Sequence, residues 1–112
     1  MRMWNVDPQK MCRKHLLGEH VECHMFVGAI NKGLSIKGYI NNDLLEPQTL
    51  RQRHDLLVTE MIRRGYNHKS PLPEFVCSRI GAVDELNNMF ELKHRCKDCF
   101  GRDYESSAAH FL

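Results

Sequence analysis

One short stretch near the start of this 112-residue chain carries three ionisable side chains at helical spacing. His15, Glu19 and Glu22 stand at positions i, i+4 and i+7, so a helix would project them as one polar stripe. The chain begins at Met1, only a few residues earlier. An α-amine beside a carboxylate can form an imine with a sugar and move the protons that this reaction requires. Taken alone, the stripe is equally typical of a solvated helix face.

Three segments have the apolar spacing of helices that could position this stripe. The first starts at Asp7-Pro8, a capping residue followed by proline at the first helical position, and runs to about Asn31, with a glycine stop at 31–33. The second runs from about residue 46 to the stop at 63–65, and the third covers about 84–99. The residues expected to face the core are Leu16, Leu17, Met25, Phe26, Ala29, Ile30, Leu50, Leu56, Leu57, Met61, Leu86, Phe90 and Leu92.

The segments between these helices have no regular pattern. Residues 33–42 show weak strand alternation that is too short for a sheet, and the prolines at 71 and 73 exclude helix. Residues 105–112 have no packing signal and are expected to form a mobile tail. Gly18, inside the first helix, is typical of a position where another backbone or a ligand comes close. The sequence predicts an all-α fold, a compact single domain (residues 1–112) of three principal helices with irregular connections.

Composition limits the class of protein further. No apolar run approaches the roughly 18 residues of a membrane span, and the first residues do not resemble a signal peptide, so a cytoplasmic location is expected. The formal net charge of +2 does not by itself indicate nucleic acid. Basic side chains gathered on one face would bind phosphates, whereas scattered ones would only be solvated. An odd number of cysteines without a secretory signal argues against a disulfide framework.

The cysteines allow two interpretations. Cys96 and Cys99 form a lone C-x-x-C, which is half of a zinc site. Closing that site would need a ligand from Cys77, His94 or His68. The favoured interpretation is two reduced cysteines at a helix end, since the strand-then-helix context of a redox motif is missing. The remaining pair, Cys12 and Cys23, lies in an apolar helical pattern and is expected to be buried as small hydrophobes.

Motifs distributed over much of the chain resemble one family of enzymes. Residues 15–22 read H-L-x-x-E-x-x-E, residues 50–53 read L-R-x-R, and residues 64–67 read R-G-(aromatic)-N. Arg2, Phe26 and Gly28-Ala29 add to this pattern, and the distance from the N-terminus to the first motif also matches. Together these residues resemble the endonuclease V type of pyrimidine-dimer DNA glycosylase.

The resemblance implies a mechanism and two catalytic residues. In that family the N-terminal α-amine attacks C1′ of a damaged nucleotide, and a glutamate on the first helix is essential. These roles fall on Met1 and Glu22. Family members often have a small second residue and lose the initiator methionine, but Arg2 is large, so Met1 should be retained. An α-amine titrates at about 7.7–8.0 against about 10.4 for lysine, so more of it is nucleophilic at cellular pH.

The resemblance also implies a partner and its contacts. Arg2 and His15 would hold flanking phosphates or orient Glu22. Further candidates for DNA contacts are the basic residues Lys14, Arg63 and Arg64. The expected partner is double-stranded DNA that contains a lesion or an abasic site, with the target nucleotide flipped out of the helix. The protein is expected to act as a monomer, in the cytoplasm of a bacterial cell or of a phage-infected host. No metal, cofactor or membrane is expected for this chemistry.

Two departures from the family affect the choice of substrate. Val21 and Met25 stand where the family carries arginines, on either side of Glu22, and the segment around Cys96 replaces a C-terminal region rich in tyrosine and tryptophan. Lyase chemistry therefore carries over better than dimer specificity, and another modified base or a simple abasic site is also a candidate. The alternative function is a non-catalytic nucleic-acid-binding module on the same scaffold, with a structural zinc as an option. A protein-interaction domain is the third candidate function.

Overall fold

The regular elements of the chain are helices. The structure, a computed structural model, describes residues 1–100, and over that range it contains no strand. Its long helices are α1 (Arg13–Asn31), α3 (Leu50–Arg63) and α4 (Glu85–Arg95), with a short α2 (Lys37–Asn41) and two 3-10 turns, η1 (Pro8–Lys10) and η2 (Pro47–Thr49). The predicted all-α fold with three principal helices is confirmed. The expected tail at 105–112 lies outside the described residues. Within the described part, no helix is both long and apolar enough to cross a membrane.

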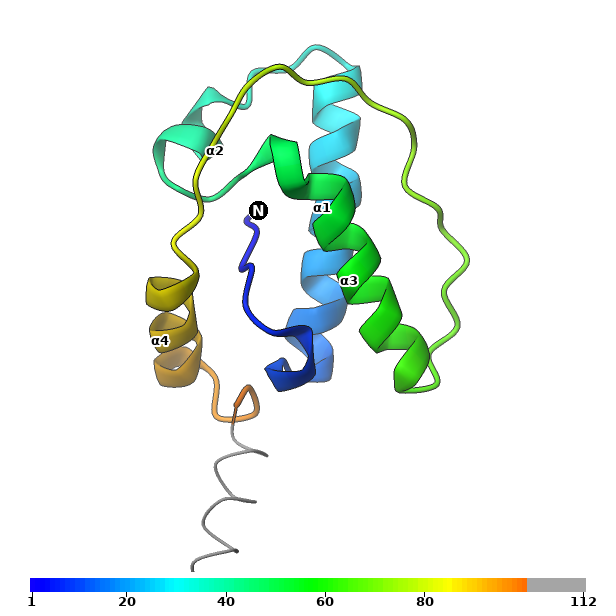
Figure 1. Cartoon of the computed structure of the whole chain (residues 1–112), viewed down its shortest axis with the longest axis vertical. Coiled ribbons are helices and arrows are strands. Elements are labelled where there is room, and N and C mark those ends of the chain that lie inside the picture. The colour runs from blue at the N-terminus through cyan, green and yellow to red at the C-terminus, as the bar shows by residue number, and fades with distance from the viewer. Residues whose placement is uncertain (101–112) are drawn as a thin grey trace, which may run out of the picture.

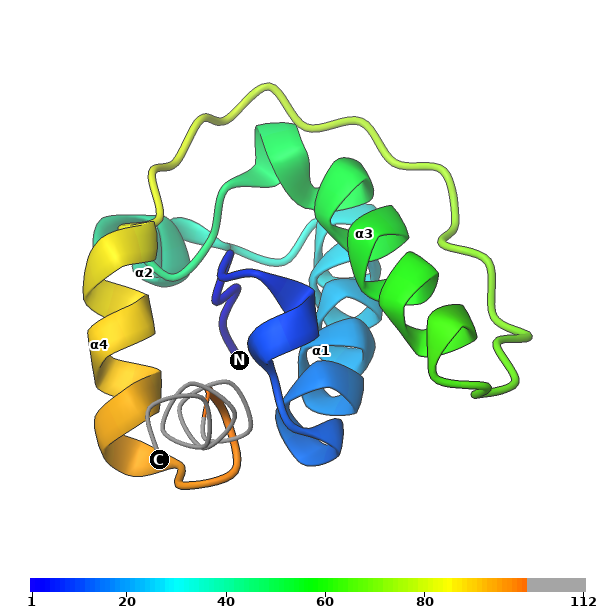
Figure 2. The same ribbon diagram turned by 60° about the horizontal axis from the view of Figure 1, so that its bottom comes forward.

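Residues 1–7, here called the N-terminal arm, run through the middle of the fold. Helices α1 and α3 lie side by side, and the arm passes between this pair and α4 (Figures 1 and 2). Residues 64–84 form a long connection without regular structure that leads from the end of α3 to the start of α4 (Figure 1). The chain's first residues are therefore surrounded by elements that come from its whole length.

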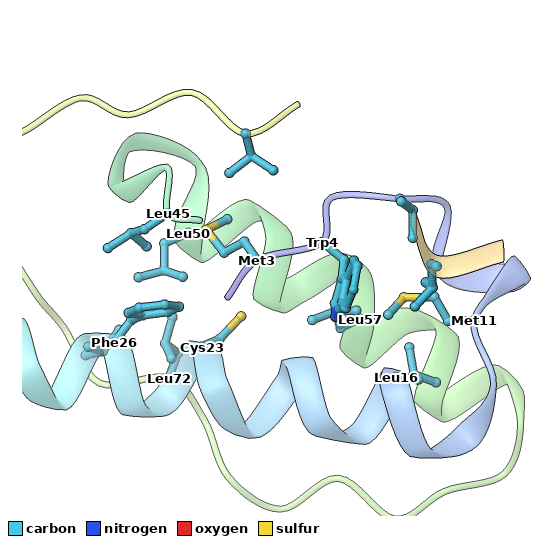
Figure 3. Packing of buried hydrophobic residues seen from close by; sticks show 14 of the residues in the cluster. Met3, Trp4, Met11, Leu16, Cys23, Phe26, Leu45, Leu50, Leu57 and Leu72 are labelled. Atoms are coloured by element: carbon cyan, nitrogen blue, oxygen red, sulfur yellow. The ribbon is translucent and has the colours of Figure 1, made fainter. Parts of the chain in front are cut away.

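Two side chains of the N-terminal arm belong to the hydrophobic core. Met3 is fully buried and Trp4 is buried, and both point into the space between α1 and α3 (Figure 3). The Met3 N–H donates a hydrogen bond of 2.8 Å to the carbonyl of Leu44, which fixes the backbone as well. Complete burial of a side chain of this size stabilises the fold by about 1.5–3 kcal/mol. The arm is thus held by both its side chains and its backbone.

The first predicted helix is broken in one place. Asp7 caps only the short η1, by accepting a hydrogen bond from Gln9 N–H, and α1 begins afresh after Cys12. The backbone at Met11 and Cys12 is extended because Met11 is buried in the core and its carbonyl accepts a 2.6 Å hydrogen bond from Arg64. Both predicted glycine stops are confirmed, since Gly33 and Gly65 have φ values of 71° and 84°.

The predicted core was correct for the central stripes of α1 and α3, and wrong at their margins and for most of α4. Leu16, Phe26, Leu50, Leu57, Met61 and Leu92 are buried, whereas the exposed residues are Met25, Leu56, Leu86 and Phe90. On α4 the inner face consists of Asn88 and Leu92. A polar residue is buried there because the Asn88 amide donates a hydrogen bond of 2.9 Å to the carbonyl of Trp4.

The long connection is fixed at Gly81, where a side chain would not fit. A Cβ built there would lie 2.0 Å from the carbonyl oxygen of Leu45. Gln48 also holds this backbone, because its amide donates to the Gly81 carbonyl at 2.6 Å and its oxygen accepts from the Gly81 N–H at 3.1 Å. At Gly18 no described atom lies within 4 Å of such a Cβ, so the close approach expected there does not come from the chain.

We expect Gly81→Ala to destabilise the protein by about 1–3 kcal/mol, because the new methyl group overpacks rigid backbone. The matched control is Gly18→Ala, which should gain up to about 1 kcal/mol from helix propensity alone. Thermal unfolding of both variants checks this. Equal melting temperatures for Gly81→Ala and the parent chain would contradict the close packing of the connection.

Candidate active site

The N-terminal amine and the predicted catalytic glutamate meet in the structure. The Met1 nitrogen lies 3.9 Å from Oε1 of Glu22, and both side chains are largely covered, at 17% and 28% exposure. Met1 also packs against the hydrophobic core, and Met3 is anchored to Leu44 two residues later. The arm therefore leaves the amine little freedom to move away from the carboxylate.

The environment of Glu22 changes its acidity. Burial raises the pKa of the Glu22 carboxyl group above its ordinary value, and this effect exceeds the opposing influence of the Met1 ammonium and of Arg2. The protonated form of Glu22 is consequently more accessible near neutral pH than it is for a solvated glutamate. A carboxyl group in this condition can exchange protons with a neighbouring nucleophile or with a sugar oxygen.

Arg2 makes its contacts inside the protein. Its guanidinium donates to Oδ1 of Asn88 at 2.7 Å and to Oε2 of Glu91 at 3.0 Å, both on α4. The same group lies 3.7 Å from the centre of the Trp4 ring, within the range of a cation–π interaction. Arg2 is only 19% exposed. Arg2 thus connects the N-terminal arm to α4 immediately beside the amine.

The three residues of the expected polar stripe of α1, which are His15, Glu19 and Glu22, lie in three different environments. Glu19 is not on the surface: it is 1% exposed and accepts hydrogen bonds from Nε and Nη2 of Arg53 at 2.6 and 2.8 Å. Arg53, on α3, also donates to the carbonyl of Val6 at 2.7 Å. This buried ion pair joins α1, α3 and the N-terminal arm. Of the stripe, only Glu22 faces the amine.

His15 faces a group of cysteines. Its Nδ1 lies 3.2 Å from Sγ of Cys12 and 3.5 Å from Sγ of Cys99. The ring also packs edge-on against Trp4, with 5.9 Å between ring centres. Burial, together with the charges of neighbouring basic residues, lowers the pKa of His15, so its neutral form prevails. The ring is therefore directed to the sulfur atoms, two helical turns from Glu22.

The other predicted DNA-contacting residues differ in exposure. Lys14 is exposed on α1, and Arg63 is 60% exposed although it pairs with Glu60 at 2.6 Å. Arg64 turns inward and donates to the carbonyls of Pro8 and Met11 at 3.1 and 2.6 Å. Both arginines border a hollow of about 490 Å³, which is lined by Gln9, Lys10, Met11, Arg63, Arg64, Tyr66, Asp98 and Phe100. Lys14 and Arg63 are the ones available to a ligand.

The C-x-x-C meets different partners from those expected. Cys96 and Cys99 lie with Cys12 and His15, and the four possible ligand atoms are within 4.8 Å of one another. Neither Cys77 nor His94 belongs to this group, and His68 lies in another one, so the expectation for the closing ligands was wrong. The expectation that Cys12 is a buried hydrophobe was also wrong, because Cys12 is half-exposed and caps α1. Cys23 is fully buried, as expected.

A second group of possible ligands was not recognised in the sequence. His20 and His24 on α1, His54 on α3 and His68 in the connection bring their ring nitrogens within 4.8 Å of one another. The spacing of His20 and His24, one helical turn apart on one face, is the signal that could have found them. His54 and His68 lie 30 and 44 residues after His24, and no pattern in the sequence around them indicates a metal site.

Comparison with known proteins identifies the family of the chain. A family model described as pyrimidine dimer DNA glycosylase matches residues 1–74, a span that holds Met1, Glu22 and the whole of α1 and α3. The chain belongs to the pyrimidine dimer DNA glycosylase family. It is therefore a DNA-repair glycosylase in the broad sense, with DNA as its substrate. Among curated proteins and solved structures, no match was found. In this glycosylase, α4 and the C-x-x-C lie beyond the matched span.

We expect Arg53→Met to cost about 3–5 kcal/mol of stability, because it leaves the Glu19 carboxylate buried without its partner. The matched control is Arg63→Met, on the same helix, where an exposed ion pair should contribute little. Urea unfolding measures both. The double variant Glu19→Met/Arg53→Met should recover much of the loss. Equal stability of Arg53→Met and Arg63→Met would contradict the role given to the buried pair.

Proposed function

We propose that this glycosylase removes a damaged base and then cleaves the strand, using the Met1 α-amine as nucleophile and Glu22 as its proton-transfer partner. The observation that carries this proposal is the 3.9 Å separation of the amine and the carboxylate at the end of an arm that is anchored in the core. A positioned amine reacts faster than a free one because the entropy of bringing the groups together has already been lost in folding.

The proposed reaction begins with attack of the neutral amine on C1′ of the sugar. The bond between C1′ and the base breaks, and the base leaves with a proton. The sugar ring then opens to give an iminium ion, while the Glu22 carboxyl group gives a proton to the ring oxygen. The raised pKa of Glu22 favours this donation, and the carboxylate that results balances the positive charge of the iminium ion.

Strand cleavage follows by β-elimination. A base removes a proton from C2′, the bond between C3′ and oxygen breaks, and the 3′ phosphate leaves. Water then hydrolyses the imine and regenerates the Met1 amine. Glu22 in its ionised form is the base nearest to the amine in the structure described above. These steps need no redox partner, since elimination and hydrolysis bring no net oxidation or reduction.

The surface around Glu22 supports recognition of a base by its apolar faces. Val21 and Met25 flank Glu22 and are 54% and 51% exposed. We propose that they contact the lesion or its neighbours, and that pyrimidine dimers are the first substrate to examine because of the family. An abasic site or another damaged base is the second. Exposed apolar side chains at an active site commonly contact a ligand.

The basic residues fall into two groups, those that are exposed and those that donate hydrogen bonds within the protein. Lys14 and Arg63 are exposed, and we propose that they contact DNA phosphates. Arg2 and Arg64 donate to groups of the protein itself, so we assign them the positioning of the N-terminal arm and of η1. His15 was expected at a phosphate or beside Glu22, but its contacts with cysteines favour the role given below.

Borohydride trapping tests the proposed mechanism. Duplex DNA with one abasic site and ultraviolet-irradiated DNA should each form a covalent adduct with the protein, since borohydride reduces the imine to a stable amine. Acetylation of the Met1 amine should abolish both adducts, and intact-mass measurement confirms the N-terminal residue. Glu22→Gln should reduce cleavage by at least about 10²-fold. The control is Glu85→Gln, an exposed glutamate at the start of α4.

The pattern of adducts separates the candidate functions. An adduct with abasic DNA alone would restrict the enzyme to lyase activity, and a further adduct with irradiated DNA would assign it dimer specificity. Binding to DNA without any adduct would overturn the catalytic proposal and favour the non-catalytic binding module. Trapping that persists after acetylation would show that Met1 is not the nucleophile.

A further inference from the structure

Four soft and borderline ligand atoms meet where the start of α1 touches the turn after α4. Sγ of Cys12 lies 3.8 Å from Sγ of Cys96 and 3.2 Å from Nδ1 of His15, and Cys99 completes the group at 3.5 Å from the same nitrogen. The sequence spacing is C-x-x-H at one end and C-x-x-C at the other. Both spacings are those at which a turn of backbone can present two ligands to one ion.

These distances match the edges of a zinc tetrahedron. With Zn–S bonds of ~2.3 Å and a Zn–N bond of ~2.0–2.1 Å, tetrahedral angles place two sulfurs about 3.8 Å apart and a sulfur and a nitrogen about 3.6 Å apart. We propose that Cys12, His15, Cys96 and Cys99 bind one Zn²⁺ ion as a closed structural site. This inference is independent of the proposed function, because the site is separate from the Met1 amine and Glu22.

The backbone around the group is arranged for thiolates. Cys12 caps the N-terminus of α1, where the helix dipole favours negative charge, and accepts a hydrogen bond from His15 N–H. Sγ of Cys99 accepts a hydrogen bond of 3.2 Å from the N–H of Cys12. Phe100, directly after the last ligand, has a φ of 61°, which is costly for a bulky residue, and its N–H donates to the carbonyl of Lys10.

Acidity at Cys96 and Cys99 depends on whether a cation is present. Burial raises the pKa of Cys99 to about 12. At Cys96 burial acts in the same direction, but the N–H groups of Cys99 and Asp98 outweigh it and lower the pKa. A divalent cation would reverse this cost at Cys99, because a coordinated thiol loses its proton.

A zinc ion here would link the last described part of the chain to residues 1–74, the region that the family model matches. Cys12 and Cys96 are 84 residues apart, and Cys96 and Cys99 lie beyond the matched span 1–74. The bound His15 would also hold Trp4, against which its ring packs. The ion would thus fix the N-terminal arm without taking part in the reaction.

Metal analysis and cobalt substitution test this zinc site. Protein made without a histidine tag should retain zinc after desalting, and Cys96→Ser should lose one equivalent that the control Cys77→Ser keeps. With Co²⁺ in place of zinc, the parent chain and Cys77→Ser should show thiolate-to-cobalt charge-transfer absorption, and Cys96→Ser should not. X-ray absorption of the zinc-loaded parent should show sulfur neighbours of zinc, three for each ion bound at this site, which keeps the test valid if Cys96→Ser does not fold.

Several results would overturn the zinc site. They are a parent chain without thiolate-to-cobalt absorption, a Cys96→Ser variant that keeps it, and a zinc shell without sulfur. A disulfide between Cys12 and Cys96, detected as two missing thiols in native protein, would also overturn it.

An independent observation points to a second metal site on the other side of α1. The Nε2 atoms of His20, His24, His54 and His68 are all buried, and none has a hydrogen-bond partner among the described residues. His20 and His54 are 8% and 3% exposed. Buried polar atoms in native proteins nearly always have partners, so four that converge without one need an explanation. A shared ligand explains all four together.

The packing of the four rings has the dimensions of a tetrahedral site. The ring centres are 4.9 to 5.6 Å apart in the five pairs that involve His20 or His54. A metal bound at ~2.0–2.1 Å lies about 3.2 Å from each ring centre, so tetrahedral rings should be about 5.2 Å apart. We infer that these four histidines bind one divalent transition metal ion of the kind that prefers imidazole, with Zn²⁺ as the probe.

The surroundings suit such an ion. Nδ1 of His54 lies 3.0 Å from a carboxylate oxygen of Asp55, and the His24 ring bonds to the main chain of Ser70, as ligand histidines usually do with their second nitrogen. Burial and the neighbouring rings lower the pKa of His20 to about 4, so its ring is neutral and able to ligate. Glu22 lies roughly 200° around α1 from His24, so this site is structural too.

The histidine site is tested with variants that each remove one of the two metal sites. The parent chain should hold two zinc equivalents, and His54→Asn should lose one, whereas the control His94→Asn, an exposed histidine, should lose none. Cobalt-loaded His54→Asn should keep the thiolate band, and cobalt-loaded Cys96→Ser should show tetrahedral d–d absorption without it. Cobalt bound to the parent chain should also shift the proton signals of these four imidazole rings, in addition to those of His15 at the first site. This readout remains available if a variant does not fold. An unchanged zinc content in His54→Asn, relative to the parent chain, would overturn this site.

Discussion

The buried pair of Glu19 and Arg53 is the interaction on which the arrangement of the molecule depends. It joins α1 to α3 in the interior, and its guanidinium also holds the carbonyl of Val6 on the N-terminal arm. Two charges out of water are stabilising only if every hydrogen-bonding atom is used, which forces the three segments into one geometry. The ion pair therefore specifies where the arm lies, while Met3 and Trp4 supply the apolar burial that keeps it there.

The same arm explains how a chain terminus can serve as a reagent. Termini are usually the least ordered parts of a protein, yet Met1 lies beside Glu22 because Met3 is pinned to Leu44 and Arg2 to α4. A lysine on a helix would offer an amine of higher pKa on a flexible stem. The structure obtains rigidity from the backbone instead, because the proposed nucleophile is attached directly to it.

Sequence reasoning succeeded where the information was local or repeated. The spacing of Leu50, Leu57 and Met61 predicted the inner face of α3, and the motif around Glu22 predicted the meeting with Met1. It failed where partners are distant. A solvated position remained open for Glu19, because nothing near it in the sequence indicates its partner Arg53. The ligand Cys12 looked like a hydrophobe because its neighbours Cys96 and Cys99 are more than 80 residues away.

The contacts of Arg2 also bear on the order in which parts of the fold form. Its partners Asn88 and Glu91 are 86 and 89 residues further along, among the last described elements to be synthesised. Contacts of such sequence separation form late, after local helices. An unfinished chain that ends before α4 would lack the partners of the Arg2 guanidinium, so this contact beside the amine forms only when the described fold is complete.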